Sequence, residues 1–357
     1  MEIINKKILL SGGGTGGSVS PLLAICESLK KEYEFFWVGT KNGIEKKMVG
    51  AEKIPYYSVS SGKFRRYFSI RNFIDPFFVL IGFFQSLGLL LNLRPDMVIT
   101  AGSFVSVPVV WAARLLRIPV LVHQQDIRPG LANKLMAPFA KVITVTFEKS
   151  LKDYGKKAVL TGSPARQSLQ NPNSKFQIPN EFSEGLPVIF ILGGGTGAKA
   201  INDLVYESMS EITKFCNVIH QTGKNKIANR KSPIINCVSF DFLNPPQMAA
   251  AYAEADLVVS RAGMGTLTEL SYFGKPAIII PMPDSHQEEN AEILKNANAA
   301  IVLNQRKLSS DKFISEIKKL LTNDNLKSEL SANIKKIIRT DADEIIKTIK
   351  AIIPAQL

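Results

Sequence analysis

Two glycine-rich segments, half a chain apart, have nearly the same sequence. They are Ile8-Leu-Leu-Ser-Gly-Gly-Gly-Thr-Gly-Gly17 and Ile189-Phe-Ile-Leu-Gly-Gly-Gly-Thr-Gly-Ala198. Each follows an apolar run typical of a buried parallel strand, and each opens a helical pattern, Pro21–Lys31 or Ala198–Ser210. Backbone N–H groups at the positive end of a helix bind phosphate oxygens well. The pair therefore indicates two phosphate-bearing ligands that meet between two similar α/β domains.

A third segment, Ser260–Ala291, also carries residues suited to a phosphate-bearing ligand. Its pattern predicts a strand, a glycine turn, a helix, a strand and a polar loop that opens a further helix. Gly263 and Gly265 let a ligand approach the backbone, and Thr266 and Thr268 offer hydroxyls near the helix N-terminus.

Three side chains of the same segment each have two possible roles, one in ligand binding and one in helix stability. We expect Glu269 in the first turn of the helix, where its carboxylate can accept hydrogen bonds from two sugar hydroxyls or simply compensate the helix dipole. Gln287 and Asn290 head the next helix, where their amides can bind a sugar or act as ordinary caps.

The elements that must position these residues alternate along the whole chain. Apolar runs and helical patterns follow one another, which is typical of doubly wound α/β domains. The expected strands are Lys7–Ser11, Phe35–Gly39, Tyr56–Ser60, Met97–Ala101, Val120–His123, Val142–Thr146, Ala158–Thr161, Val188–Leu192, Asn217–Gln221, Cys237–Phe240, Leu257–Ser260, Ala277–Pro281 and Ala300–Leu303. We divide the chain into an N-terminal domain (1–166), a polar linker (167–186), a C-terminal domain (187–335) and a helical tail (336–357).

Composition limits the possible partners. The 357 residues carry a net charge of +13, which favours anionic partners, but no nucleic-acid-binding signature is visible. Three scattered cysteines fit a reducing cytosol, and Met1–Lys7 leave no room for a signal peptide before the first strand. Because His123, His220 and His286 lie far apart in the chain, we expect no bound cofactor; whether a divalent cation assists stays open.

The segment from Lys63 to Leu91 departs from the α/β pattern. Arg65 and Arg66 lie among aromatic residues, and the apolar run that follows includes Phe77 and Phe84. We read this run as too short and too polar to span a bilayer. Basic and apolar residues together suit a helix that lies on an anionic membrane surface. The alternative is a buried helix with a basic rim.

The motifs together resemble the nucleotide-sugar glycosyltransferases of the two-domain GT-B fold. Among them the chain is most similar to the bacterial family that adds N-acetylglucosamine to undecaprenyl-diphospho-muramoyl-pentapeptide (lipid I). The motifs that carry the resemblance are the two glycine loops, Phe104–Pro108, His123 with Pro129–Lys134, Gly162–Arg166, His220–Lys224 and Ser260–Ala291. The resemblance implies two Rossmann-like doubly wound domains that face a cleft.

The resemblance also implies a site for UDP-N-acetylglucosamine, mostly in the second domain. The implied residues are Phe242 and Leu243 around the uracil, Glu269 at the ribose, Gly195, Met264, Gly265, Thr266, Leu267 and Thr268 at the diphosphate, and Gln287 at the transferred sugar. Arg166 would bind nucleotide or phosphate, because the guanidinium fork matches phosphate oxygens. Thr15, Gly16 and Gly17 would lie at the acceptor diphosphate.

The chain departs from the family at four positions. Ser18 replaces a histidine, Gln124 a glutamate, Asp126 an asparagine and Gly195 a serine. Serine and glutamine are poor bases, yet inverting transfer needs a base for the attacking hydroxyl. We therefore predict Asp126 as the base, with His123 next. The alternative for Asp126 is an N-cap of the helix near Pro129–Asn133.

The resemblance implies an inverting transferase bound peripherally to the cytoplasmic face of the cell membrane. It would move N-acetylglucosamine from its uridine diphosphate donor to the undecaprenyl-linked acceptor in peptidoglycan synthesis. Three alternatives stay open. These are a related GT-B enzyme acting on another lipid acceptor, a nucleotide-sugar epimerase of the same fold, and a non-catalytic protein that binds UDP-sugar or lipid carrier.

Overall fold

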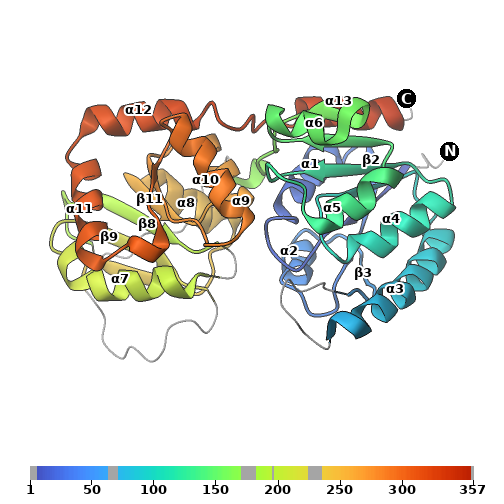
Figure 1. The fold of residues 1–357 in the computed structure, drawn as a ribbon, viewed down its shortest axis with the longest axis horizontal. Coiled ribbons are helices and arrows are strands. Elements are labelled where there is room, and N and C mark those ends of the chain that lie inside the picture. The colour runs from blue at the N-terminus through green and yellow to red at the C-terminus, as the bar shows by residue number, and fades with distance from the viewer. Residues whose placement is uncertain (1–5, 63–70, 170–181, 195–196, 224–234, 355–357) are drawn as a thin grey trace. The chain divides into compact units, whose positions relative to one another are not determined.

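The chain folds into two compact units, each built on its own sheet. The computed structural model describes residues 6–62, 71–169, 182–194, 197–223 and 235–354. Unit 1 contains Met1–Arg166 and Asp341–Leu357, and unit 2 contains Gln167–Thr340. Each unit has a parallel sheet with helices packed on its faces (Figure 1), which confirms the predicted doubly wound α/β architecture.

The sheet of unit 1 has the strand order β3-β2-β1-β4-β5-β6-β7. Its strands are β1 (Lys6–Ser11), β2 (Tyr33–Gly39), β3 (Tyr56–Ser58), β4 (Met97–Thr100), β5 (Val120–Gln124), β6 (Val142–Val145) and β7 (Ala158–Leu160). All neighbours pair in parallel, and β1 lies between β2 and β4, with Leu10 opposite Trp37 on one side and Ile99 on the other. The order therefore reverses between β1 and β4.

The helices of unit 1 cover both faces of this sheet. They are α1 (Ser20–Leu29), α2 (Glu45–Ala51), α3 (Arg71–Leu93), α4 (Ser106–Leu115), α5 (Leu131–Met136), α6 (Leu151–Tyr154) and α13 (Asp343–Ile352). Ile8 and Leu10 face a core that α1 and α13 close, whereas Leu9, between them, faces the core under α3, α4 and α5. Alternate side chains of β1 are thus buried on opposite faces, as in any parallel strand covered on both sides.

The C-terminal helix α13 belongs to unit 1, although the chain reaches it from unit 2. Ile345 and Ile349 are buried in the core beside α1 (Figure 1). The Tyr33 hydroxyl donates to the Ile353 carbonyl over 2.7 Å, which fastens the end of the chain to β2. The last helix therefore completes the apolar core of the first unit.

Unit 2 repeats the design with the strand order β10-β9-β8-β11-β12-β13. Its strands are β8 (Val188–Leu192), β9 (Asn217–Gln221), β10 (Cys237–Phe240), β11 (Leu257–Ser260), β12 (Ala277–Ile279) and β13 (Ile301–Val302). Its helices are α7 (Lys199–Ile212), α8 (Pro245–Glu254), α9 (Met264–Phe273), α10 (His286–Asn296), α11 (Ser310–Leu321) and α12 (Asp324–Ile334). Here the strand order reverses between β8 and β11.

Every strand expected from the sequence is present, and the bounds of four of them, all in unit 2, are as predicted. The strand expected at Ala277–Pro281 ends at Ile279, two residues early. This is the usual uncertainty at element ends, because hydrogen bonding stops before the apolar run does. The order reversals, which decide where a ligand can bind, follow from the pairing and could not be read from strand positions alone.

Helix α3 corrects one expectation. The apolar run was read as too short and too polar to span a bilayer, but Asp75–Leu93 has a mean hydropathy of 1.8 and is long and apolar enough to do so by length and composition. The reason is that the helix continues without a break through Gly82 and Gly88. Length is not the only constraint, however, since a Cβ on Gly82 would come within 1.9 Å of the Ser60 carbonyl oxygen. The helix therefore packs closely on its own unit.

Candidate functional site

In unit 2 the order reverses between β8 and β11, and each of these neighbouring strands is followed by a glycine turn. In open α/β sheets, ligands bind beyond the carboxyl ends of the strands at such a reversal. The second glycine loop follows β8, and the Gly263 turn follows β11. Gly197 has φ +70° and a Cβ there would lie 2.0 Å from the Thr222 carbonyl oxygen, so only glycine fits. Gly195 lies outside the described residues.

Helix α9 presents its N-terminus at this edge. Its N-cap is Gly263, and no side chain caps the helix, which suits a site for an anion. Met264, Thr266, Leu267 and Thr268 are buried, and Gly265 is half-buried. The Thr268 side chain is 5% exposed, and its hydroxyl makes no hydrogen bond with the described residues. A ligand that supplied a partner would remove the cost of this unsatisfied group.

The sequence predicts Glu269 in the first turn of its helix, but in the structure it lies in the second turn of α9. The helix already begins at Met264, so that Glu269 is its sixth residue. Compensation of the helix dipole is therefore weak here, because the effect falls off within the first turn. Instead, the Tyr252 hydroxyl donates to Glu269 Oε2 over 2.9 Å.

Tyr252, which no motif in the sequence indicates, fixes the orientation of that carboxylate. The ring is fully buried on α8, stacked on Phe273 at 4.9 Å and edge-on to Phe190 at 5.2 Å. Burial, and then the charge of Glu269, raise the pKa of Tyr252 well above its ordinary value. The phenol therefore stays protonated and holds the half-buried Glu269 in place as a hydrogen-bond donor.

Gln221, at the end of β9, connects two sides of the predicted nucleotide site. Its Oε1 accepts from the Leu243 backbone N–H over 3.1 Å, and its Nε2 donates to the Gly194 carbonyl over 3.4 Å. Leu243 is buried, whereas the neighbouring Phe242 is 46% exposed. Residues 242–243 thus combine an exposed aromatic ring with a backbone held in place, and the binding of uracil there stays a prediction.

The two amides of α10 have different environments. Ser285 is the N-cap of this helix, so neither Gln287 nor Asn290 has that role. Asn290 is buried and donates to the Ala262 carbonyl over 3.2 Å, which ties α10 to the turn before α9. Gln287 Oε1 accepts from the Met282 backbone N–H over 3.0 Å, but its Nε2 donates to none of the described residues. The Gln287 amide is thus the one with a donor left for a sugar hydroxyl.

In unit 1 the reversal between β1 and β4 places the first glycine loop at the carboxyl edge of that sheet. Thr15 is exposed and Gly16 and Gly17 are half-buried. The backbone N–H groups of these three residues donate to no acceptor in the described part of the chain. Ser18, where the family has a histidine, is buried, and its hydroxyl donates to the Gly13 carbonyl over 3.2 Å. It closes the loop.

Gln124 has a clear structural reason to differ from the family's glutamate. Its Nε2 donates to the carbonyls of Asp126, over 2.6 Å, and Arg128, over 3.2 Å. Its Oε1 accepts from Asn133 Nδ2 and the Tyr154 hydroxyl, over 2.6 and 2.8 Å. An ionised glutamate cannot donate to the two carbonyls. Gln124 therefore holds the loop that carries Asp126.

The two residues predicted as bases lie in contrasting places. Asp126 is half-buried in the loop after β5, and it does not cap α5, because the N-cap of that helix is Gly130. His123 is fully buried within β5, with Nδ1 2.9 Å from Thr144 Oγ1. Burial lowers the pKa of His123 to about 4. A histidine so placed stays neutral and binds a proton weakly, which leaves Asp126 as the better candidate.

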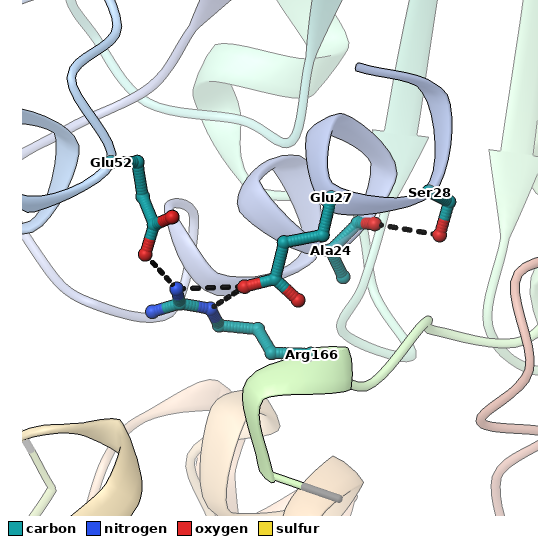
Figure 2. A network of polar contacts seen from close by, with 5 residues as sticks. All are labelled: Ala24, Glu27, Ser28, Glu52 and Arg166. Atoms are coloured by element: carbon teal, nitrogen blue, oxygen red, sulfur yellow. Dashed lines mark hydrogen bonds and ion pairs between the residues drawn. The ribbon is translucent and has the colours of Figure 1, made fainter. Parts of the chain in front are cut away.

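Arg166 meets carboxylates of its own unit (Figure 2). Its Nε donates to Glu27 Oε1 over 2.8 Å, and its Nη2 pairs with both Glu27 and Glu52. The side chain is 5% exposed. The two carboxylates hold the guanidinium in place, and its Nη1 donates to none of the described residues.

Comparison with known proteins identifies the family. Residues 8–145 match the N-terminal domain of glycosyltransferase family 28, and residues 188–349 match its C-terminal domain. A Clostridium botulinum (strain Loch Maree / Type A3) protein is 38% identical over 93% of this chain and 97% of its own. The chain belongs to glycosyltransferase family 28. That relative is named UDP-N-acetylglucosamine–N-acetylmuramyl-(pentapeptide) pyrophosphoryl-undecaprenol N-acetylglucosamine transferase.

Solved structures agree with the family 28 assignment. The crystal structure of Acinetobacter baumannii MurG aligns with a TM-score of 0.71 and 26% identity, over 97% of this chain and 99% of that one. A UDP-GlcNAc 2-epimerase from Neisseria meningitidis, bound to UDP-GlcNAc, aligns with a TM-score of 0.72 over 97% and 100% of the two chains, but at 14% identity it shows the shared fold alone. The predicted family and the two-domain GT-B fold are thereby confirmed.

Proposed function

We propose that this family 28 glycosyltransferase transfers N-acetylglucosamine from UDP-N-acetylglucosamine to lipid I, with inversion at the anomeric carbon. The observation that carries the proposal is the donor-ready edge of unit 2. There, an uncapped helix N-terminus, an unsatisfied Thr268 hydroxyl and a Tyr252-oriented Glu269 occur at the reversal of the sheet. The name of the C. botulinum relative supports the choice of sugar and acceptor.

On the donor side, the backbone of α9 stabilises the leaving diphosphate. Negative charge develops on the bridging oxygen as the glycosidic bond breaks, and a fixed helix N-terminus needs no reorganisation to meet it. Glu269 accepts hydrogen bonds from the ribose hydroxyls, and Gln287 Nε2 donates to the transferred sugar. Residues 242–243 hold the uracil.

On the acceptor side, the first glycine loop binds the acceptor diphosphate through Thr15, Gly16 and Gly17. Asp126 takes the proton from the muramoyl 4-hydroxyl as that oxygen attacks the anomeric carbon. Within the described residues no group of three or more His, Cys, Asp or Glu side chains is placed to hold a metal ion.

Incubation with UDP-N-acetylglucosamine and lipid I tests the proposal directly. We expect lipid II and uridine diphosphate in equal amounts. Transfer to diacylglycerol in place of lipid I would instead establish a transferase for another lipid. Binding of the nucleotide sugar without turnover on either lipid would show the non-catalytic alternative, and formation of the 2-epimer without an acceptor would show an epimerase.

We further propose that α3 is the segment that contacts an anionic membrane, with the protein bound peripherally at the cytoplasmic face. Phe77 and Phe84 are 68% and 61% exposed, which contradicts the alternative of a buried helix. Exposed apolar side chains recur at helical spacing as Phe77, Leu80, Ile81, Phe84 and Leu91. The opposite face of α3, with Leu90 and Leu93, is buried in unit 1. A helix with one face buried in its own unit and the other exposed is better suited to lie at the membrane interface than to cross the bilayer. Arg65 and Arg66 lie outside the described residues.

Replacing Phe77 and Phe84 by Ser is expected to lower partition onto vesicles at least about tenfold, since each buried phenyl ring contributes about 1.5–3 kcal/mol. Adding Arg65→Glu and Arg66→Glu should abolish binding and its rise with anionic lipid. Sedimentation with vesicles of graded anionic content measures both. Leu160→Ser, which removes another exposed apolar side chain of unit 1, is the control. Binding retained by the folded fourfold variant would contradict α3 as the contact.

A further inference from the structure

The carboxylate of Glu45 is fully buried beneath the first glycine loop. Glu45 opens α2, and its side chain is 0% exposed. Oε2 accepts from the Gly14 backbone N–H over 3.0 Å, and Oε1 accepts from the Thr40 backbone N–H over 2.8 Å and from the Thr40 hydroxyl. In the described part of the chain it pairs with no lysine or arginine. A buried charge of this kind is tolerated only because its oxygens are hydrogen-bonded.

The backbone around Glu45 is shaped to fit it. A Cβ on Gly13 would come within 2.4 Å of Oε1, and a Cβ on Gly43 within 2.0 Å of Oε2. Glycine at both positions lets two separate loops, one after β1 and one after β2, approach the same carboxylate. Glu45 therefore fixes the first glycine loop to the neighbouring loop, which the sequence alone did not indicate.

This contact divides the first glycine loop into an anchored part and a free part. The Gly14 N–H is used by Glu45, whereas those of Thr15, Gly16 and Gly17 donate to none of the described residues. A carboxylate close to an anion-binding loop repels the anion, so Glu45 cannot contribute by charge. Its contribution is geometric, because it holds Gly14 at φ +79° and so presents the following N–H groups.

We infer that Glu45 is a positioning residue that sets the first glycine loop for the diphosphate of the lipid acceptor. This inference rests on the proposed function. Glu45 touches neither substrate, and its effect passes through Gly14. It should therefore matter for the acceptor and not for the donor, whose site is assigned to unit 2.

Glu45→Gln is expected to raise KM for lipid I about tenfold, because the NH2 group of the amide must face either the Gly14 or the Thr40 backbone N–H, and a buried hydrogen bond that holds the loop is lost. KM for UDP-N-acetylglucosamine and the affinity for uridine diphosphate should stay within about twofold. Thr40→Val removes only the hydroxyl donor and keeps the Gly14 contact, so its KM for lipid I should stay near that of the wild type. Tyr33→Phe, which loses a buried hydrogen bond elsewhere in unit 1, is the stability control.

An acceptor KM unchanged in Glu45→Gln, or equal losses for donor and acceptor, would overturn the inference. If Glu45→Gln does not fold, Gly13→Ala displaces the same carboxylate and should show the same acceptor-selective effect. Should the wild type form no lipid II, the proposed function fails by itself. Binding of undecaprenyl diphosphate in detergent then tests the role of Glu45 separately. Equal binding by the wild type and Glu45→Gln, or binding by neither, would overturn the inference that Glu45 positions the loop.

Discussion

The Asp126→Asn variant is expected to lose about two to four orders of magnitude in kcat while its affinity for uridine diphosphate stays unchanged. The substitution keeps the shape of the side chain and removes only its basicity. Gln124 Nε2 binds the backbone carbonyl of Asp126, and the substitution leaves this contact in place. A loss of activity would therefore report lost proton transfer.

The pH profile separates a base from a structural residue. If Asp126 is the base, the acidic limb of kcat/KM in the wild type should disappear in the residual activity of Asp126→Asn. Asp153→Asn, which removes an exposed carboxylate of unit 1, is the control and should be fully active. Full activity of Asp126→Asn on lipid I would make Asp126 structural. His123 would be tested next, although its burial within β5 argues against it.

The fold could be predicted because its signals are local. The apolar run Ile189–Leu192, for example, is buried and is followed by the glycine turn and then by α7, which begins at Lys199. The strand order is a different matter, since β1 pairs with β4 across almost ninety residues of sequence. Only the structure could place both glycine loops at the order reversals.

The candidate site was predictable where a motif carries its own chemistry, and not where distant residues meet. The threonines and Glu269 could be named from the turn after β11. Their supports could not, because Tyr252 lies seventeen residues before Glu269 and Glu45 lies thirty-one after Gly14. The sequence shows Gln124 as a departure from the family. The structural reason for an amide at this position is seen only in its four hydrogen-bond partners.

Glu269→Ala is expected to weaken binding of uridine diphosphate by about 1–3 kcal/mol, the cost of leaving the ribose hydroxyls without their acceptor. Isothermal titration calorimetry on the folded variant measures the change. Glu254→Ala, at the last residue of α8, removes an exposed carboxylate of the same unit from the end of that helix and should leave the affinity unchanged.

Two further variants assign the loss to the ribose. Tyr252→Phe removes the hydroxyl that orients the carboxylate but keeps the stacked ring, so its effect should be smaller and in the same direction. Glu269→Ala should also weaken the binding of uridine more than that of uracil, because only the nucleoside carries the hydroxyls that the carboxylate accepts from. An unchanged affinity for uridine diphosphate in Glu269→Ala would show that the ribose lies elsewhere, and the role of Glu269 as acceptor for the buried Tyr252 hydroxyl would then be structural.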